Sequence, residues 1–146
     1  MKSLVPMLAA LLLLQACGEP RPNPAAPTGP MVRLAAVPGR PAAGYFELPI
    51  RGDRGALLSV TSPRAGRIQM HETIASGAMT AMRPLTRVPV RDGETLRFAS
   101  GGRHLMIYDV DSRVRPGDRI VLILNFERGA PAQLEAVVTT AGGETR

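Results

Sequence analysis

The most constraining feature of this chain is a repeated alternation of short apolar runs and chain-breaking residues. Between residues 32 and 139, runs rich in Val, Leu, Ile and Ala are interrupted about every eight to twelve residues by Gly, Pro or Asp, a spacing typical of sandwiches and barrels. No stretch carries a helical period of apolar residues. The sequence therefore predicts an all-β domain.

Nine strands are expected, and their patterns differ. Leu96 and Phe98 alternate with polar neighbours, as on a strand with one buried face. The run 120–126 is apolar at almost every position, which indicates a strand buried on both faces. The glycine pair 101–102 predicts a hairpin turn before the strand that begins at His104. The expected strands are residues 32–37, 44–50, 56–62, 67–73, 86–90, 95–99, 104–110, 119–126 and 132–139.

Histidine and methionine are rare outside one short stretch. After residue 17 the chain has seven of them, and six lie between positions 70 and 106. Imidazole nitrogen and thioether sulfur together favour a soft metal ion, above all Cu(I), whereas magnesium and calcium prefer oxygen. This concentration predicts a copper site. The six residues are Met70, His71, Met79, Met82, His104 and Met106.

The spacing of four of these residues supports a shared site. His104 and Met106 are two positions apart on an expected strand, so their side chains share one face and lie about 6.5 to 7 Å apart. His71 closes the strand-like run 66–71, and the ten residues between it and Met82 are expected to form a loop that brings the thioether back. The candidate ligands are therefore His71, Met82, His104 and Met106.

Each candidate also has a purely structural explanation. A single methionine commonly fills a gap in a core, and a single histidine on a strand is commonly a satisfied polar residue; only the joint spacing favours copper. Met70 is adjacent to His71 on a strand and faces the opposite way, so we expect it in the core. Met79 is either an exposed loop thioether or an auxiliary copper contact, and the sequence leaves both interpretations open.

The order of the candidate ligands resembles a known signature. His71, ten residues, Met82, twenty-one residues, His104, one residue and Met106 is similar to the copper-ligand pattern of the PCu(A)C family of periplasmic copper chaperones. The similarity covers roughly residues 32–139. The short sequence motifs around these residues also match the family pattern, namely His71-Glu72-Thr73, Met82-Arg83-Pro84, Gly101-Gly102-Arg103-His104-Leu105-Met106 and Pro116-Gly117-Asp118.

The resemblance implies a cupredoxin-like, Greek-key β-barrel or sandwich that binds Cu(I) through those four residues and passes copper to the copper centres of cytochrome c oxidase. Two departures from the family pattern matter. Thr80 stands where members often carry a second methionine. The chain also ends without the His- and Met-rich extension that some relatives use for Cu(II), so one main site is expected.

The first residues read as an export signal. Lys2 supplies a positive start and residues 4–14 form an apolar core, which is shorter than the about 20 residues that a membrane-spanning helix needs. Residues 14–17 then resemble a lipoprotein cleavage box in which Cys17 becomes the lipidated first residue. The alternative is ordinary cleavage after Ala16 that leaves a free thiol, but the chain has no other cysteine to pair with it.

These segments define the expected organisation and location. Residues 1–16 form the signal peptide, 17–30 a lipid-anchored proline-rich tether, 31–141 the copper-binding domain and 142–146 a disordered tail. The protein is expected to be exported and anchored to a membrane facing the periplasm. Gly18 after Cys17 favours sorting to the outer membrane in a Gram-negative host.

Charge and composition exclude several functions. Without Lys2 the chain carries 17 Arg and 12 acidic residues, a net charge of +5. Arg83 and Arg103, which adjoin the candidate ligands, could steer an acidic partner or could belong to a solvated basic surface. Nucleic-acid binding lacks an aromatic stacking platform and suits a different compartment. Blue-copper electron transfer needs a Cys thiolate within the domain, and the one cysteine of the chain, Cys17, precedes it.

The sequence therefore predicts a lipid-anchored Cu(I) chaperone that is not an enzyme, because both histidines belong to the metal and no nucleophile and base remain. Its expected partner is a copper acceptor such as a cytochrome c oxidase subunit or assembly factor. Two alternatives remain. One is a copper-buffering or scavenging lipoprotein without a dedicated acceptor, and the other is a tethered β-sandwich interaction module whose His and Met are structural.

Overall fold

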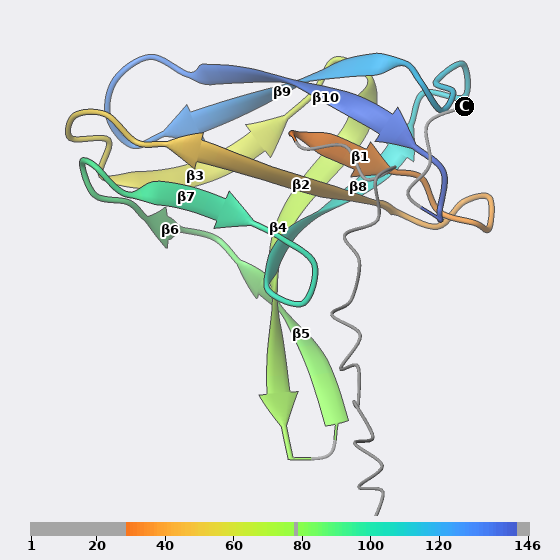
Figure 1. Ribbon diagram of the computed structural model, residues 1–146, viewed down its shortest axis with the longest axis horizontal. Helices are drawn as coiled ribbons and strands as arrows, with labels where there is room; N and C mark the ends of the chain where they lie inside the picture. The colour runs from red at the N-terminus through yellow and green to blue at the C-terminus, as the bar shows by residue number, and fades with distance from the viewer. Residues whose placement is uncertain (1–28, 78, 143–146) are drawn as a thin grey trace, which may run out of the picture.

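Every regular element of the described chain is a β-strand (Figure 1). The computed structural model describes residues 29–77 and 79–142, and no helix within these ranges is long and apolar enough to span a membrane. The predicted signal peptide, Cys17 and nearly all of the tether and tail lie outside the described residues. The strands are β1 Met31–Arg33, β2 Ala42–Pro49, β3 Ala56–Thr61, β4 Ala65–Ser76, β5 Met79–Leu85, β6 Val88–Pro89, β7 Thr95–Phe98, β8 Arg103–Val110, β9 Arg119–Phe126 and β10 Ala132–Thr139.

The ten strands join one hydrogen-bonded sheet in the order β5-β4-β8-β2-β1-β10-β9-β3-β6, and β7 pairs with β2 outside this path. Among the described strands, β1 and β10 pair in parallel and the other pairings are antiparallel. Figure 1 shows most strands stacked in one body, from which the far ends of β4 and β5 project as a hairpin. The all-β expectation is confirmed.

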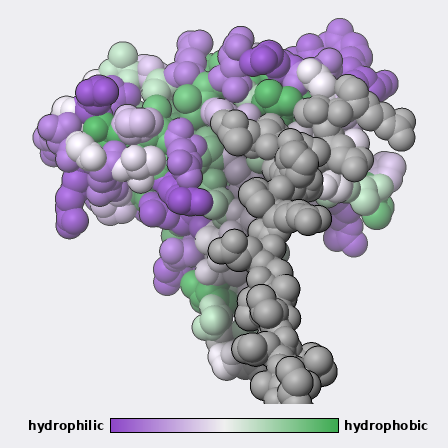
Figure 2. Space-filling view, viewed as in Figure 1, coloured by the Kyte–Doolittle hydropathy of each residue, from purple (hydrophilic) through white to green (hydrophobic). Residues whose placement is uncertain are grey.

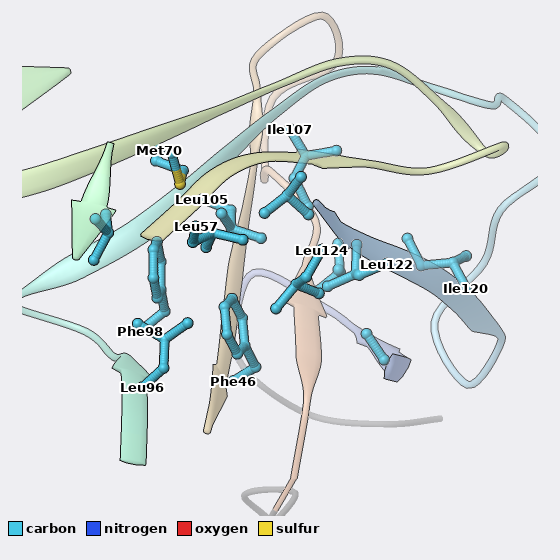
Figure 3. Close-up of a cluster of buried hydrophobic side chains, with 14 of the residues drawn as sticks. Phe46, Leu57, Met70, Leu96, Phe98, Leu105, Ile107, Ile120, Leu122 and Leu124 are labelled. Atoms are coloured by element: carbon cyan, nitrogen blue, oxygen red, sulfur yellow. The ribbon is translucent and has the colours of Figure 1, made fainter. Parts of the chain in front are cut away.

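The hydrophobic core takes one side chain in two from the strands, because successive side chains on a strand point to opposite faces. Leu105 and Ile107 of β8 are fully buried. Phe46 of β2 stacks on Phe98 of β7 with ring centroids 4.7 Å apart. Met70 of β4 enters the same cluster (Figure 3), which confirms its expected core position.

The largest difference from the expected strands is β5. The residues between His71 and Met82 are not a loop: β4 continues to Ser76, and β5 returns along it as an antiparallel partner. The prediction missed β5 because all but the last of its residues are exposed, so no alternation of buried and exposed residues marks it in the sequence. Pro84 within the run is also a residue that sheets accept mainly on edge strands, which is where β5 lies.

Smaller differences affect three other predictions. β1 ends at Arg33 rather than 37, and β6 contains only two residues of the expected 86–90 strand. The glycine pair forms a tight turn, with Gly101 at a φ of 80°, but β7 pairs with β2 and not with β8. The turn therefore connects two strands that both pair with β2 instead of closing a hairpin between them.

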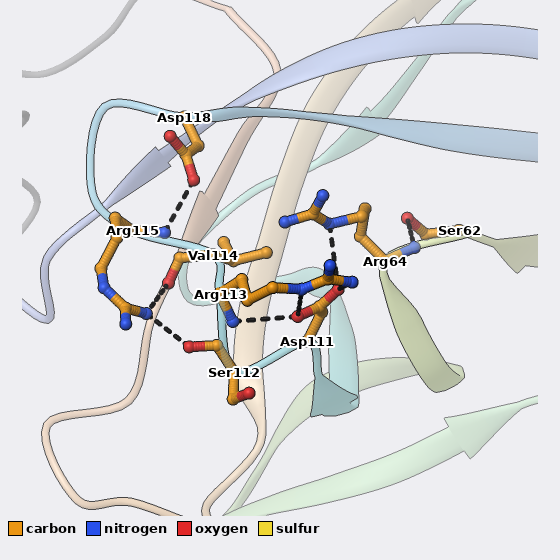
Figure 4. Close-up of polar contacts among 8 residues, drawn as sticks. All are labelled: Ser62, Arg64, Asp111, Ser112, Arg113, Val114, Arg115 and Asp118. Atoms are coloured by element: carbon orange, nitrogen blue, oxygen red, sulfur yellow. Dashed lines mark hydrogen bonds and ion pairs between the residues drawn. The ribbon is translucent and has the colours of Figure 1, made fainter.

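The connection from β8 to β9 is fixed by arginine–carboxylate pairs (Figure 4). Asp111 accepts hydrogen bonds from the backbone N–H, Nε and Nη2 of Arg113 at 2.9, 3.1 and 2.8 Å, and it also pairs with Arg64. These bonds hold the pKa of Asp111 far below its usual range. Asp118 accepts from the backbone N–H of Arg115 at 2.8 Å. The turn before β9 therefore has a defined conformation.

Candidate metal centre

The four candidate ligands lie on three neighbouring strands. In the β4–β8 pair, His71 is directly opposite His104, and Gln69 is opposite Met106. In the β4–β5 pair, Met82 is opposite Thr73, two positions along β4 from His71. Residues that are directly opposite each other in an antiparallel pair point to the same face.

This register assigns all four candidates to one face of the sheet. His104 and Met106 share a face with His71, and Met82 shares a face with Thr73 and so also with His71. The intervening residues Leu105 and Met70 point into the core. The candidate ligands therefore lie on the face that is turned away from the core.

The two imidazoles have a separation that suits one shared ion. Their ring centroids are 6.0 Å apart and the rings are inclined by 35°. With metal–nitrogen bonds of about 2 Å, an ion held by both rings lies about 3 Å from each centroid. Among the described residues, no three His, Cys, Asp or Glu side chains group to hold a metal ion, so an ion between the two imidazoles would need donors of another kind, such as the thioethers.

The His104 ring is oriented by the glycine turn. Its Nδ1 lies 3.0 Å from the carbonyl oxygen of Gly102, and because a carbonyl can only accept, Nδ1 carries the proton and donates. Nε2 is then left with a free lone pair for a metal. The same carbonyl accepts the backbone N–H of Thr73 at 3.1 Å, so this turn joins β4 to β8 beside the site.

The His71 ring differs from the His104 ring in its hydrogen bonding. Both of its nitrogens are buried, and neither has a hydrogen-bond partner among the described residues. Leaving a buried polar group unpaired costs about 1 to 3 kcal/mol, and such groups in native structures commonly indicate a missing ion or water. A metal bound at one nitrogen would remove part of this cost. The free lone pairs of His71 and His104 and nearby thioethers fit a soft ion.

Burial also changes the protonation of His71. Removal from water lowers the pKa of its imidazole below the usual value near 6.5, and the neighbouring His104 lowers it further. The neutral form, which is the form that binds a metal, is therefore favoured at neutral pH and somewhat below it.

The methionines differ in exposure. Met106 is half-buried on the body of the sheet, whereas Met82 is 59% and Met79 is 74% exposed on the projecting hairpin. Figure 2 shows hydrophobic colouring on this hairpin. Met79 is opposite Ser76 and three positions from Met82, so the strand alternation directs it to the other face. This geometry favours an exposed thioether over an auxiliary metal contact for Met79.

The arginines near the site do not all face it. Arg83 pairs with Glu72 across the hairpin at 2.7 Å, and both residues lie on the face opposite His71. Arg103 lies over the Phe98 ring on the core side of β8. Adjacency in sequence therefore does not give Arg83 or Arg103 a position on the ligand face. Arg67, which the sequence analysis did not single out, lies there instead, opposite Tyr108.

Comparison with solved structures gives the class of domain. The fold is similar to the copper-bound PCuAC domain from PmoF2, with a TM-score of 0.60, 21% identity and coverage of 76% of this chain and 88% of that one. It is also similar to the solution structure of CuI-DR1885 from Deinococcus radiodurans, with a TM-score of 0.56, 24% identity and coverage of 80% and 78%. The chain therefore has the cupredoxin-like PCuAC fold, as the resemblance implied.

Comparison with sequences then gives the family. The family model described as "Putative lipoprotein LpqE-like" matches residues 26–138, and this chain belongs to the LpqE-like family. A curated relative, "Putative lipoprotein Lxx21020" of Leifsonia xyli subsp. xyli (strain CTCB07), is 28% identical over 88 residues, which cover 60% of this chain and 53% of the relative. The aligned region thus spans about half the length of that relative.

The lowered pKa of His71 predicts a pH-dependent stability of the metal-free protein. The folded pKa lies below the unfolded value of about 6.5, so as the pH falls the unfolded state takes up the proton first. The contribution of the neutral His71 imidazole to the free energy of unfolding is complete above about pH 6.5 and is lost as the pH falls toward the folded pKa. Urea unfolding at about pH 7.5 and 5.5 should show a smaller loss of stability in His71→Gln than in the wild type. Equal losses in both proteins would contradict this assignment.

Proposed function

We propose that this chain is a Cu(I) carrier that binds one ion through His71, Met82, His104 and Met106. The observation that supports this most directly is the pairing of His71 with His104 across β4 and β8, at a ring separation of 6.0 Å. The His71 nitrogens, which have no hydrogen-bond partner among the described residues, and the oriented ring of His104 suit both side chains to metal binding.

The choice of donors suits a carrier. Thioethers hold Cu(I) without adding charge, and unlike thiolates they do not form disulfides in an oxidising compartment. Met82 lies on an exposed hairpin strand, whereas His104 is buried. An acceptor could therefore replace the Met82 thioether first, while the histidines still hold the ion. The proposed activity is binding and transfer of copper rather than catalysis.

Membership of a lipoprotein family supports export and anchoring. We propose that Cys17 carries the lipid and that residues 17–30 tether the domain to a membrane facing the periplasm. The proposed partner is a copper-accepting subunit or assembly factor of cytochrome c oxidase. This delivery role follows the resemblance to PCuAC chaperones.

Anaerobic titration with Cu(I) against a competing chelator tests the site. The wild type should bind one equivalent, and Ala at His71, His104 or Met106 should weaken binding by at least about 100-fold, because losing a ligand costs more than the 10- to 100-fold typical of outer-shell partners. X-ray absorption should count two nitrogen and two sulfur scatterers.

Met79→Leu is the matched control for this titration, because it removes an exposed thioether from the same hairpin. It should leave the affinity unchanged, whereas Met82→Leu should weaken binding. Absence of a tight equivalent in the wild type would reject both copper proposals and leave the tethered interaction module.

A deletion strain separates delivery from buffering. At low copper, loss of the gene should reduce assembled cytochrome c oxidase activity, and the wild-type gene should restore it while His71→Ala does not. Added copper should restore activity without the protein, because it bypasses a carrier. Normal oxidase activity in the copper-starved deletion strain would favour the buffering role.

Fatty-acid labelling tests the anchor. Cells that express the chain should incorporate a labelled fatty acid into it, and Cys17→Ser should abolish the label, because the chain has no other thiol. Equal labelling of the variant would exclude Cys17 as the lipid attachment site.

A further inference from the structure

Two side chains that are not candidate ligands continue the ligand face along β4 and β8. Tyr108 lies two positions beyond Met106, and Arg67 is directly opposite it. The hydroxyl of Tyr108 donates to the sulfur of Met106, with Oη and Sδ 3.8 Å apart. The guanidinium carbon of Arg67 lies 4.2 Å from the centroid of the Tyr108 ring. Arg67, Tyr108 and Met106 therefore form a chain of contacts that ends at a proposed ligand.

The contact matters because a methionine side chain is flexible. Its three rotatable bonds allow the sulfur several positions, and fixing such a side chain on binding costs conformational entropy. A donor that is already bonded to the sulfur reduces the number of positions before a metal arrives. A thioether sulfur has two lone pairs, so one can accept from Tyr108 while the other faces an ion.

Arg67 in turn restricts Tyr108. A guanidinium over a tyrosine ring is held by the negative face of the ring, and the interaction is typical within about 6 Å of the centroid. Both side chains are on adjacent strands of the same pair, so the backbone fixes their spacing. The guanidinium of Arg67 consequently holds one face of the Tyr108 ring while the hydroxyl contacts the sulfur of Met106.

We propose that Tyr108 is a positioning residue for the Met106 thioether and that Arg67 holds Tyr108 in place. The inference rests on the proposed function of Met106 as a Cu(I) ligand. Tyr108 acts through Met106 and does not bind the ion itself. Its hydroxyl makes the sulfur available in one orientation, which tightens binding mainly by slowing release of the ion.

The second tyrosine of the chain provides a matched control. Tyr45 on β2 also has an arginine over its ring, since the guanidinium carbon of Arg33 lies 5.2 Å from its centroid. Its hydroxyl, however, accepts from Nη2 of Arg33 at 2.6 Å. Tyr45→Phe therefore removes a hydroxyl from a similar environment, but one in which the hydroxyl bonds to an arginine instead of a methionine sulfur.

The test compares Tyr108→Phe with Tyr45→Phe in the full chain. Tyr108→Phe keeps the ring and its stacking with Arg67 and removes only the hydroxyl. It should weaken Cu(I) binding by about tenfold, the lower end of the range for outer-shell partners, with most of the change in the dissociation rate. Tyr45→Phe should leave the affinity unchanged.

A double-mutant cycle shows whether the effect passes through Met106. In a Met106→Leu background, Tyr108→Phe should have no further effect on the remaining affinity. A tenfold loss in that background would overturn the proposal, as would a wild-type affinity in the single variant.

A measurement without copper separates this proposal from the proposed function. With carbon-13 labelled methionine methyl groups, Met106 in the metal-free wild type should give the shift of one rotamer, and Tyr108→Phe should move it toward the averaged shift of the exposed Met79. Unchanged Met106 shifts would overturn the positioning role even if copper binds. A protein that binds no copper but shows the change would reject the proposed function and keep the contact between Tyr108 and Met106.

Discussion

The antiparallel pairing of β4 with β8 is the constraint on which the candidate site depends. Side chains alternate between two faces, so a slip of one residue would send His71 into the core and Met70 out of it. Burial of Met70, Leu105 and Ile107 opposes such a slip, because each large apolar side chain contributes about 1.5 to 3 kcal/mol when buried. The register that brings His71 opposite His104 is therefore fixed by the residues between the candidate ligands.

The proposed ligands differ in how firmly the sheet holds them: those on β4 and β8 are rigid, and the one on β5 is exposed. His104 is buried and its ring is held by the Gly102 carbonyl, which also bonds to β4. Met82 lies on an edge strand that projects from the body, and every residue of that strand except Leu85 is exposed. Elements with few buried contacts open more readily than core strands. A carrier benefits from this difference, because a rigid pair retains the ion while an exposed ligand can be replaced.

Much of the candidate site was predictable because histidine and methionine are rare in this chain. The two histidines and four of the seven methionines lie in one short stretch, and the two-residue spacing of His104 and Met106 already assigns them to one face. The alternation also predicted that Met70 would be buried. β5 was missed because its side chains are exposed and leave no periodic pattern. The directions of Arg83 and Arg103 were not predicted, because both residues fell outside the expected strands and the alternation of faces holds only within a strand.

The sequence by itself determined the all-β class and the candidate donors, since both follow from local composition and from spacing along a single strand. Tertiary structure decided which strands are neighbours, because the pairing of His71 with His104 joins residues that are far apart in the chain. It also supplied the carbonyl that orients His104 and the tyrosine that contacts Met106. These contacts depend on a register that many buried side chains set together, and no single stretch of sequence contains that information.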